Sequence, residues 1–181
     1  MRDFLAEQSS LGLTYPGIGR MADTPPDGYT VDHTRVELGT GDAVFESACT
    51  ALQNWKQIRL SWMRAWPEDT PICEGSVIAL LARSCGFWWL NACRIVYTVN
   101  EQSSNRRFGF AYGTLPAHAG SGEERFTVEI DDNGAVWYEI LAFSRASSLA
   151  ARVAYLMFRA SQRRFSVESV KVMRQIVESA Q

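Results

Sequence analysis

The sequence lacks the features that mark secreted, membrane-spanning and metal-binding proteins. Its first ten residues, MRDFLAEQSS, have no apolar signal-peptide core, and the richest apolar run, GFWWLNAC, is far too short to cross a bilayer. The four cysteines include no C-x-x-C pair and only two histidines accompany them, so their spacing supports no zinc site. We therefore expect a cytoplasmic protein with reduced thiols, no metal and no transmembrane segment.

An excess of charge of one sign is also missing. The 18 basic and 20 acidic side chains give a formal charge of −2, which favours no polyanionic partner, so we expect no binding to nucleic acid. No internal repeat or low-complexity tract is present. What is present suits one globular domain: 181 residues, 46% of them hydrophobic and 12% aromatic. The oligomeric state stays open.

The residue patterns predict an order of elements. Residues 1–28 are rich in proline and glycine, so we expect an irregular segment packed on a single domain of residues 29–181. That domain begins with an alternating strand, YTVDHTRVEL, followed by an amphipathic helix from Asp42 to Trp55. Five strand-like runs joined by short turns then occupy residues 76–145, and DDNG is the best hairpin turn among them. This order predicts an antiparallel meander.

Two further segments are less regular. Residues 56–67 fit a helical stripe of tryptophans or a strand equally well, and we leave them undecided. After Arg145 the helical period returns for roughly thirty residues, with a break expected at Phe165-Ser166. The run CGFWWLN is either an aromatic lip or a corner of the core.

Four blocks carry a resemblance to known proteins: GYTVDHTRVELGTG, NACRIVYTV, RFGFAYGTLPAHAGSGEERFTVEI and GAVWYEILAFSR. They are similar to an uncharacterised family of bacterial and plant proteins, over about Tyr15 to Arg145. The order of elements resembles the helix-grip superfamily of steroidogenic-acute-regulatory lipid-transfer and birch-pollen-allergen proteins. The resemblance implies an α+β fold in which a curved antiparallel sheet wraps around a long C-terminal helix, with a cavity between them for a hydrophobic ligand.

The stretch GFAYGT matches neither a phosphate loop nor a dinucleotide-binding fingerprint, so we expect no cofactor. Its alternation instead gives one strand face only small residues: Gly109, Ala111 and Gly113. Such a face allows close approach by another element. The favoured interpretation is that the long helix packs there, and the alternative is that the space accommodates a ligand.

Candidate site residues follow from the same blocks. For orienting a ligand we select Arg94, Tyr112, Tyr138, Glu139 and Arg145. Alternation in the last strand slightly favours Tyr138 on the core face and Glu139 on the surface, and Arg94, Arg125 or Arg145 would pair with Glu139 if it were buried.

We expect a protein that binds a small hydrophobic or aromatic molecule, and catalysis is the less favoured alternative. An enzyme using the same cavity for cyclisation, dehydration or hydrolysis would rely on His118, Glu123 or Tyr112 for proton transfer. A third hypothesis is an interaction module that uses the tryptophans between Trp55 and Trp66 or the arginines of the last helix.

Overall fold

The computed structural model describes residues 1–19, 27–84, 86–102, 105–146 and 155–179. Its elements, in chain order, are α1 (Arg2–Ser9), β1 (Thr30–Thr40), α2 (Asp42–Gln53), the 3-10 helix η2 (Lys56–Ile58), β2 (Met63–Trp66), β3 (Val77–Ser84), β4 (Phe87–Glu101), β5 (Arg106–Thr114), β6 (Gly120–Ile130), β7 (Ala135–Ala146) and α4 (Tyr155–Glu178).

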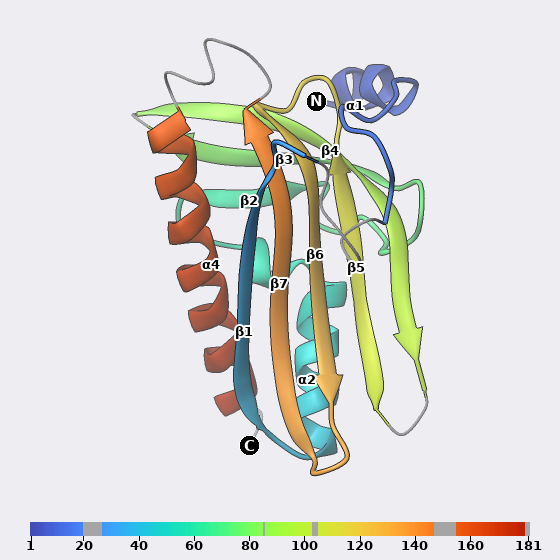
Figure 1. The fold of residues 1–181 in the computed structure, drawn as a ribbon, viewed down its shortest axis with the longest axis vertical. Helices are drawn as coiled ribbons and strands as arrows, with labels where there is room; N and C mark the ends of the chain where they lie inside the picture. Colours follow the sequence, from blue (N-terminus) through green and yellow to red (C-terminus); the bar gives the residue numbers. More distant parts are fainter. Residues whose placement is uncertain (20–26, 85, 103–104, 147–154, 180–181) are drawn as a thin grey trace.

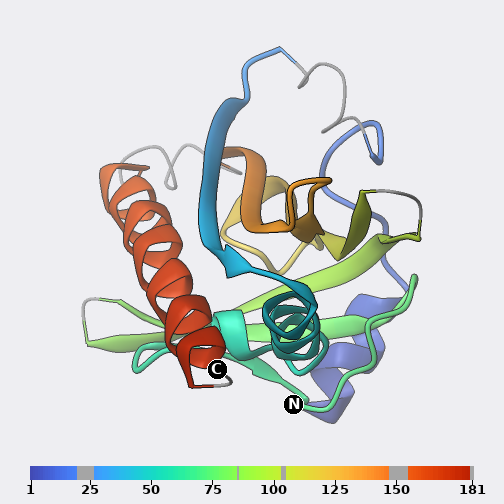
Figure 2. The ribbon, with the colours of Figure 1, turned by 90° about the horizontal axis from the view of Figure 1, so that it is seen from below.

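The seven strands form one antiparallel sheet in the order β1-β7-β6-β5-β4-β3-β2. The sheet curls around α2 and α4, which occupy its concave side, while its convex side faces the viewer in Figure 1. Figure 2 shows the same curve from below, with α4 closing one side. The expected α+β architecture, a curved antiparallel sheet with a long C-terminal helix, is confirmed. None of the described helices combines the length and apolarity needed to cross a membrane.

The local patterns explain most of these elements. The DDNG turn joins β6 to β7 as predicted: Gly134 has a positive φ of 77°, and its N–H donates to the Asp131 carbonyl at 2.8 Å. The undecided segment 56–67 contains both structures, first the turn of η2 and then the short strand β2. Trp55 and Trp62 are buried there, so they form no exposed apolar patch for a partner.

Two expectations about the helices were wrong. The predicted break at Phe165-Ser166 is absent, because Phe165 is buried in the core and the Ser166 hydroxyl donates to the Gln162 carbonyl within the helix. The N-terminal segment is not irregular throughout, because residues 2–9 form α1, which packs against β3 and β4. The part of the predicted helix at residues 147–154 lies outside the described residues.

The small-residue face of β5 is covered by the N-terminal segment, which corrects the expectation that α4 packs there. The core cluster that includes Phe110 and Tyr112 lies on the other, concave face with α2 and α4. On the convex face, residues 10–19, here called the N-terminal strap, cross the sheet, and the Tyr15 ring lies directly over Gly113. Sequence periodicity identified a face that tolerates close approach, but it could not say which element uses it.

Hydrogen bonds hold the strap against the sheet. The Arg94 guanidinium donates to the carbonyls of Ser9 and Leu11, at 2.7 and 2.9 Å. The Thr14 N–H donates to the Thr114 carbonyl at 3.1 Å, and the Ser121 hydroxyl donates to the Thr14 carbonyl at 2.9 Å. The strap is therefore an integral layer over the convex face.

Substituting Gly113 should test how much the fold depends on this layer. In Gly113→Ala the new Cβ would lie 2.7 Å from Cε1 of Tyr15, so we expect the free energy of unfolding to fall by about 1–3 kcal/mol in urea denaturation. Gly12→Ala is the control, because its Cβ would meet no atom within 4 Å. In a Tyr15→Ala background the Gly113→Ala penalty should shrink, and an equal penalty in both backgrounds would contradict the contact as its cause.

Candidate functional site

A row of polar side chains crosses the concave face of the sheet near the start of α4. The strand registers place Asp32, Ala142, Glu124 and Tyr112 next to one another on β1, β7, β6 and β5. Side chains of neighbouring strands at the same register point to the same face. The sequence thus brings two carboxyl groups and a phenol together on the side of the sheet that the helices cover.

Glu124 lies at the centre of this row and has no cationic partner among the described residues. The Tyr112 hydroxyl donates to its Oε2, and Tyr112 itself is buried. Burial raises the pKa of Glu124 to about 7, the bond from Tyr112 opposes that rise, and the nearby charge of Asp32 adds to it. A carboxyl with this pKa exchanges a proton near neutral pH.

Residues of α4 complete the polar row from above. The Arg159 guanidinium forms an ion pair with Asp32. One turn further on, the Gln162 amide donates to the Ser144 hydroxyl at 2.9 Å. These contacts fix the described start of α4 over the end of the sheet that carries Glu124.

Below the polar row, aromatic side chains pack between the sheet and the helices. Phe110, Phe126 and Phe165 are buried and contact one another, with ring centroids 5.5 and 6.0 Å apart along the series. The buried Tyr138 hydroxyl lies 2.9 Å from the hydroxyl of Ser169 in α4. Apolar walls with a few oriented polar groups are the usual composition of a small-molecule site.

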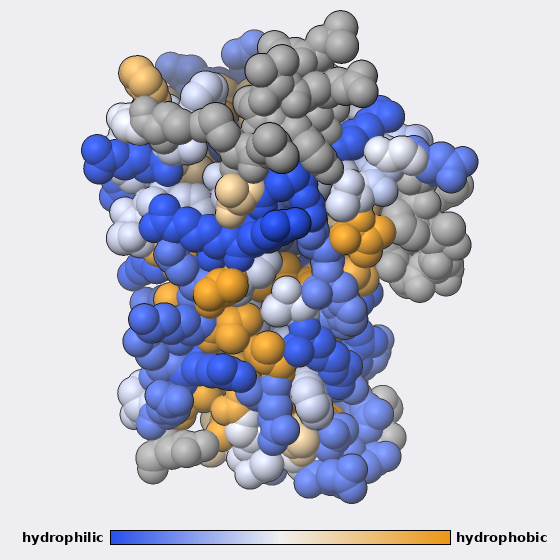
Figure 3. All heavy atoms as spheres, turned by 60° about the vertical axis from the view of Figure 1, so that its left-hand side comes forward, coloured by the Kyte–Doolittle hydropathy of each residue, from blue (hydrophilic) through white to orange (hydrophobic). Residues whose placement is uncertain are grey.

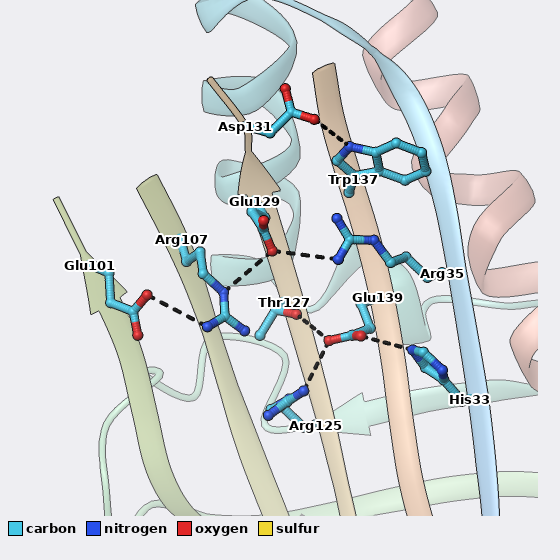
Figure 4. A network of polar contacts seen from close by, with 10 residues as sticks. All are labelled: His33, Arg35, Glu101, Arg107, Arg125, Thr127, Glu129, Asp131, Trp137 and Glu139. Carbon is cyan, nitrogen blue, oxygen red and sulfur yellow. Dashed lines mark hydrogen bonds and ion pairs between the residues drawn. The ribbon is translucent and has the colours of Figure 1, made fainter. Parts of the chain in front are cut away.

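Glu139, another predicted ligand-binding residue, lies on the opposite, convex face (Figure 4). Its carboxylate accepts from Arg125 at 2.9 Å and from Thr127 at 3.2 Å, and its other oxygen lies 2.8 Å from His33 Nε2. Burial raises its pKa, but His33 and Arg125 outweigh that effect, and the pKa is lowered overall. Of the three arginines considered as its partner, the structure selects Arg125.

The convex network continues beyond Glu139. Figure 4 shows Arg107 and Arg35 converging on Glu129, and Asp131 accepting a bond from the Trp137 indole at 3.1 Å. Each carboxylate of this network thus has at least one described donor. Side chains of β7 alternate between the faces as expected from the sequence: Tyr138 lies on the core face and Glu139 on the convex face.

Glu123 also belongs to the convex face, beneath the N-terminal strap. It is 2% exposed, and its Oε2 accepts from the Tyr15 hydroxyl at 2.6 Å and from the Gly19 N–H at 3.1 Å. Burial raises its pKa, and these two hydrogen bonds oppose the rise. Glu123 therefore lies on the opposite face of the sheet from the Tyr112–Glu124 pair.

His118 lies in the turn between β5 and β6 and is partly buried. Its Nδ1 accepts from the Gly120 N–H at 2.9 Å, and burial lowers its pKa to about 4, so the ring is neutral at physiological pH. The structure does not bring His118, Glu123 and Tyr112 together. Their catalytic roles stay predictions.

The remaining predicted ligand-binding residues are spread over both faces. Arg94 binds the strap carbonyls, and the Arg145 guanidinium lies 4.7 Å from the ring centroid of Tyr29. Only Tyr112 and Tyr138 lie on the concave face with the polar row. Whether any of the five contacts a ligand stays a prediction.

Sequence reasoning missed Glu124 as a site residue. The signal was present, because Glu124 alternates in phase with the core residues Phe126 and Val128. Asp32 and Arg159 carried no comparable signal, since their pairing joins residues 127 positions apart.

The surface clefts of the described residues lie away from the polar row. Two surface clefts are outlined by described residues, of about 320 Å³ beside Trp88 and about 670 Å³ between α1 and Trp66, and neither lies under α4. Within the same residues, no three His, Cys, Asp or Glu side chains are grouped to hold a metal ion.

Comparisons with known proteins place the chain in a family. A family model described as a domain of unknown function, DUF1990, matches residues 14–172. A UPF0548 protein of Dictyostelium discoideum is 36% identical over 162 residues, covering 84% of this chain and 75% of the relative. A UPF0548 protein of Deinococcus radiodurans is 36% identical over 172 residues, covering 89% and 85%.

Solved structures agree with the fold. The Zhui aromatase/cyclase of Streptomyces sp. R1128 superposes with a TM-score of 0.55 at 14% identity, covering 83% of this chain and 94% of that one. Ara h 8.0201 gives a TM-score of 0.50 at 11% identity, covering 84% and 99%. At such identities the likeness shows the helix-grip fold alone. By sequence, this chain belongs to the DUF1990/UPF0548 family.

Proposed function

We propose that the protein binds a small hydrophobic or aromatic molecule between the sheet and α4, with a polar group of that molecule anchored at Tyr112 and Glu124. The observation that carries the proposal is the bond from the buried Tyr112 to the partly buried Glu124, which has no cation beside it among the described residues. Withdrawing a carboxyl from water without a cation is costly, and groups kept in that state are typical of functional sites. The aromatic side chains below the pair would supply affinity through apolar burial if they part to admit the molecule.

A second buried polar group lies on an element that contacts α4. Gln57 of η2 is fully buried, and neither its amide nitrogen nor its amide oxygen has a hydrogen-bond partner among the described residues. The η2 turn packs against α4 on the concave side. An unsatisfied amide inside a core usually has a functional or ligand-related explanation.

Acid-base catalysis at the same site is the second candidate. It is favoured by one observation, the pKa of Glu124 near 7, which suits a group that both gives and takes a proton. Tyr112 would hold the carboxyl in place, since burial keeps the pKa of its hydroxyl well above the usual value. In this version Glu124 takes the role that the sequence assigned to Glu123.

Ligand binding should be visible with 1-anilinonaphthalene-8-sulfonate as a fluorescent probe, and by mass spectrometry of small molecules released from natively purified protein. Ala142→Trp fills the concave face between Asp32 and Glu124, so we expect it to abolish probe binding. Tyr112→Phe removes one hydroxyl and should weaken binding about three- to tenfold.

Tyr97→Phe is the matched control, because Tyr97 pairs in register with Ala111 on the convex face. It should leave probe binding unchanged. The proposal fails if no small molecule is released and if Ala142→Trp, with its circular dichroism and thermal midpoint retained, binds the probe as well as the parent protein.

The raised pKa of Glu124 predicts a specific pH dependence of stability. The folded state holds the proton up to about pH 7, whereas the unfolded chain loses it near pH 4.5, so this carboxyl lowers the stability progressively as the pH rises between those values. Glu124→Gln should therefore gain stability relative to the parent protein between pH 5 and pH 8, by about 1–3 kcal/mol in urea denaturation. Glu37→Gln, at an exposed position of β1, is the control, and a Glu124→Gln difference that is constant with pH would refute the assignment.

A further inference from the structure

The hairpin between β3 and β4 exposes three consecutive aromatic residues, Phe87, Trp88 and Trp89, here called the aromatic tip. Their exposed fractions are 71%, 48% and 54%. Figure 2 shows that this hairpin projects past α4, away from the rest of the molecule. Of the two interpretations open for this run, the core corner is therefore wrong, and the lip stays a prediction. Three large aromatic side chains in contact with water call for an explanation.

The tip presents aromatic side chains on both faces of the hairpin. Residues of a strand alternate between the faces, so Trp88 points to one side and Phe87 and Trp89 to the other. Trp88 pairs across the hairpin with Arg83, and Trp89 with Ala82. A partner protein seated on one face would leave the aromatic side chains of the other face in water.

Cationic side chains border the tip on the Trp88 side. The Arg64 guanidinium lies 5.2 Å from the Trp88 ring centroid, and Arg83 lies beside the same ring in register. Neither arginine forms an ion pair with a carboxylate among the described residues. The cleft next to Trp88 also holds Arg59 and Glu68, which pair with each other. The free charge beside the aromatic tip is therefore positive.

We propose that the aromatic tip docks the protein on an anionic lipid surface. Tryptophan favours the headgroup region of a bilayer, where its ring is buried and its N–H stays wet. A hairpin with aromatic side chains on both faces is surrounded by lipid when it enters that region. Arg64 and Arg83 then lie at the level of the anionic headgroups, which attract them.

A second copy of the chain fits the tip less well. Pairing two tips would bring the arginines of both copies together without carboxylates to compensate them. Three half-exposed aromatic residues also provide less than the about 800 Å² per partner that stable protein interfaces bury. This proposal does not depend on ligand binding under α4, because the tip lies outside the core cluster that includes Tyr112.

Vesicle sedimentation tests the proposal with the full chain. We expect binding to vesicles of phosphatidylcholine with phosphatidylserine, weaker binding to phosphatidylcholine alone, and loss of the difference at high salt. Phe87→Ser with Trp89→Ser should weaken binding by about tenfold or more, and Arg64→Gln with Arg83→Gln should remove the preference for phosphatidylserine.

Val167→Ser is the control for a lost exposed apolar side chain. Val167 is 69% exposed on α4, whose side of the molecule carries further apolar surface in Figure 3. Val167→Ser should bind vesicles like the parent protein. A loss of binding in this control would overturn the proposal that the aromatic tip is the membrane contact. Absence of binding to either vesicle would overturn it too, as would a dimer in light scattering that dissociates on Phe87→Ser with Trp89→Ser.

A measurement on the folded protein makes the result independent of variant stability. Vesicles with brominated acyl chains should quench tryptophan fluorescence in the parent protein. The quenching should be lost in Trp88→Phe with Trp89→Phe, which keeps the aromatic surface but removes the two reporters. Quenching that persists in this variant would assign the contact to other tryptophans and refute the proposal.

Discussion

Glu123 and Glu124 are consecutive residues of β6, and the fold buries the first and partly buries the second. Because side chains alternate along a strand, one of the two must enter each face. A buried carboxyl is costly unless it is protonated, hydrogen-bonded or paired with a cation. The layers on both sides of the sheet must therefore supply partners, and each does so through a tyrosine: Tyr15 for Glu123 and Tyr112 for Glu124.

The convex partner explains why residues before the first strand belong to the fold. Tyr15 reaches Glu123 only because Gly113, the register neighbour of Glu123 on β5, has no side chain. Arg94 and Thr14 then fix the part of the chain that precedes Tyr15. The strap thus covers the outer face of the sheet because three features fit together. Glu123 on β6 needs a hydrogen-bond donor, Tyr15 supplies it, and Gly113 on β5 leaves room for the Tyr15 ring.

Local patterns in the sequence predicted much of this arrangement. Alternation and turn chemistry identified β1, the meander and the DDNG hairpin, and the change to a helical period identified α2 and α4. Alternation also separated Tyr138 from Glu139 correctly. It could not predict that the strap and not α4 covers Gly113, because the pattern of one strand does not reveal which way the sheet curves. Nor could it reveal the Asp32–Arg159 pair, which depends on where a distant helix begins its crossing.

The two faces differ in how their carboxylates are compensated, and this difference indicates where a ligand would gain most. On the convex face Glu139 meets Arg125 and His33, and its pKa is lowered, so its charge is already stabilised within the protein. On the concave face the described residues give Glu124 only Tyr112 as a partner, and its pKa is raised to about 7. A polar atom arriving at Glu139 would have to displace Arg125 or His33, whereas one arriving at Glu124 would add a second partner beside Tyr112. A polar ligand group would therefore gain more from a hydrogen bond under α4 than on the convex face. The buried aromatic side chains lie on the same concave face.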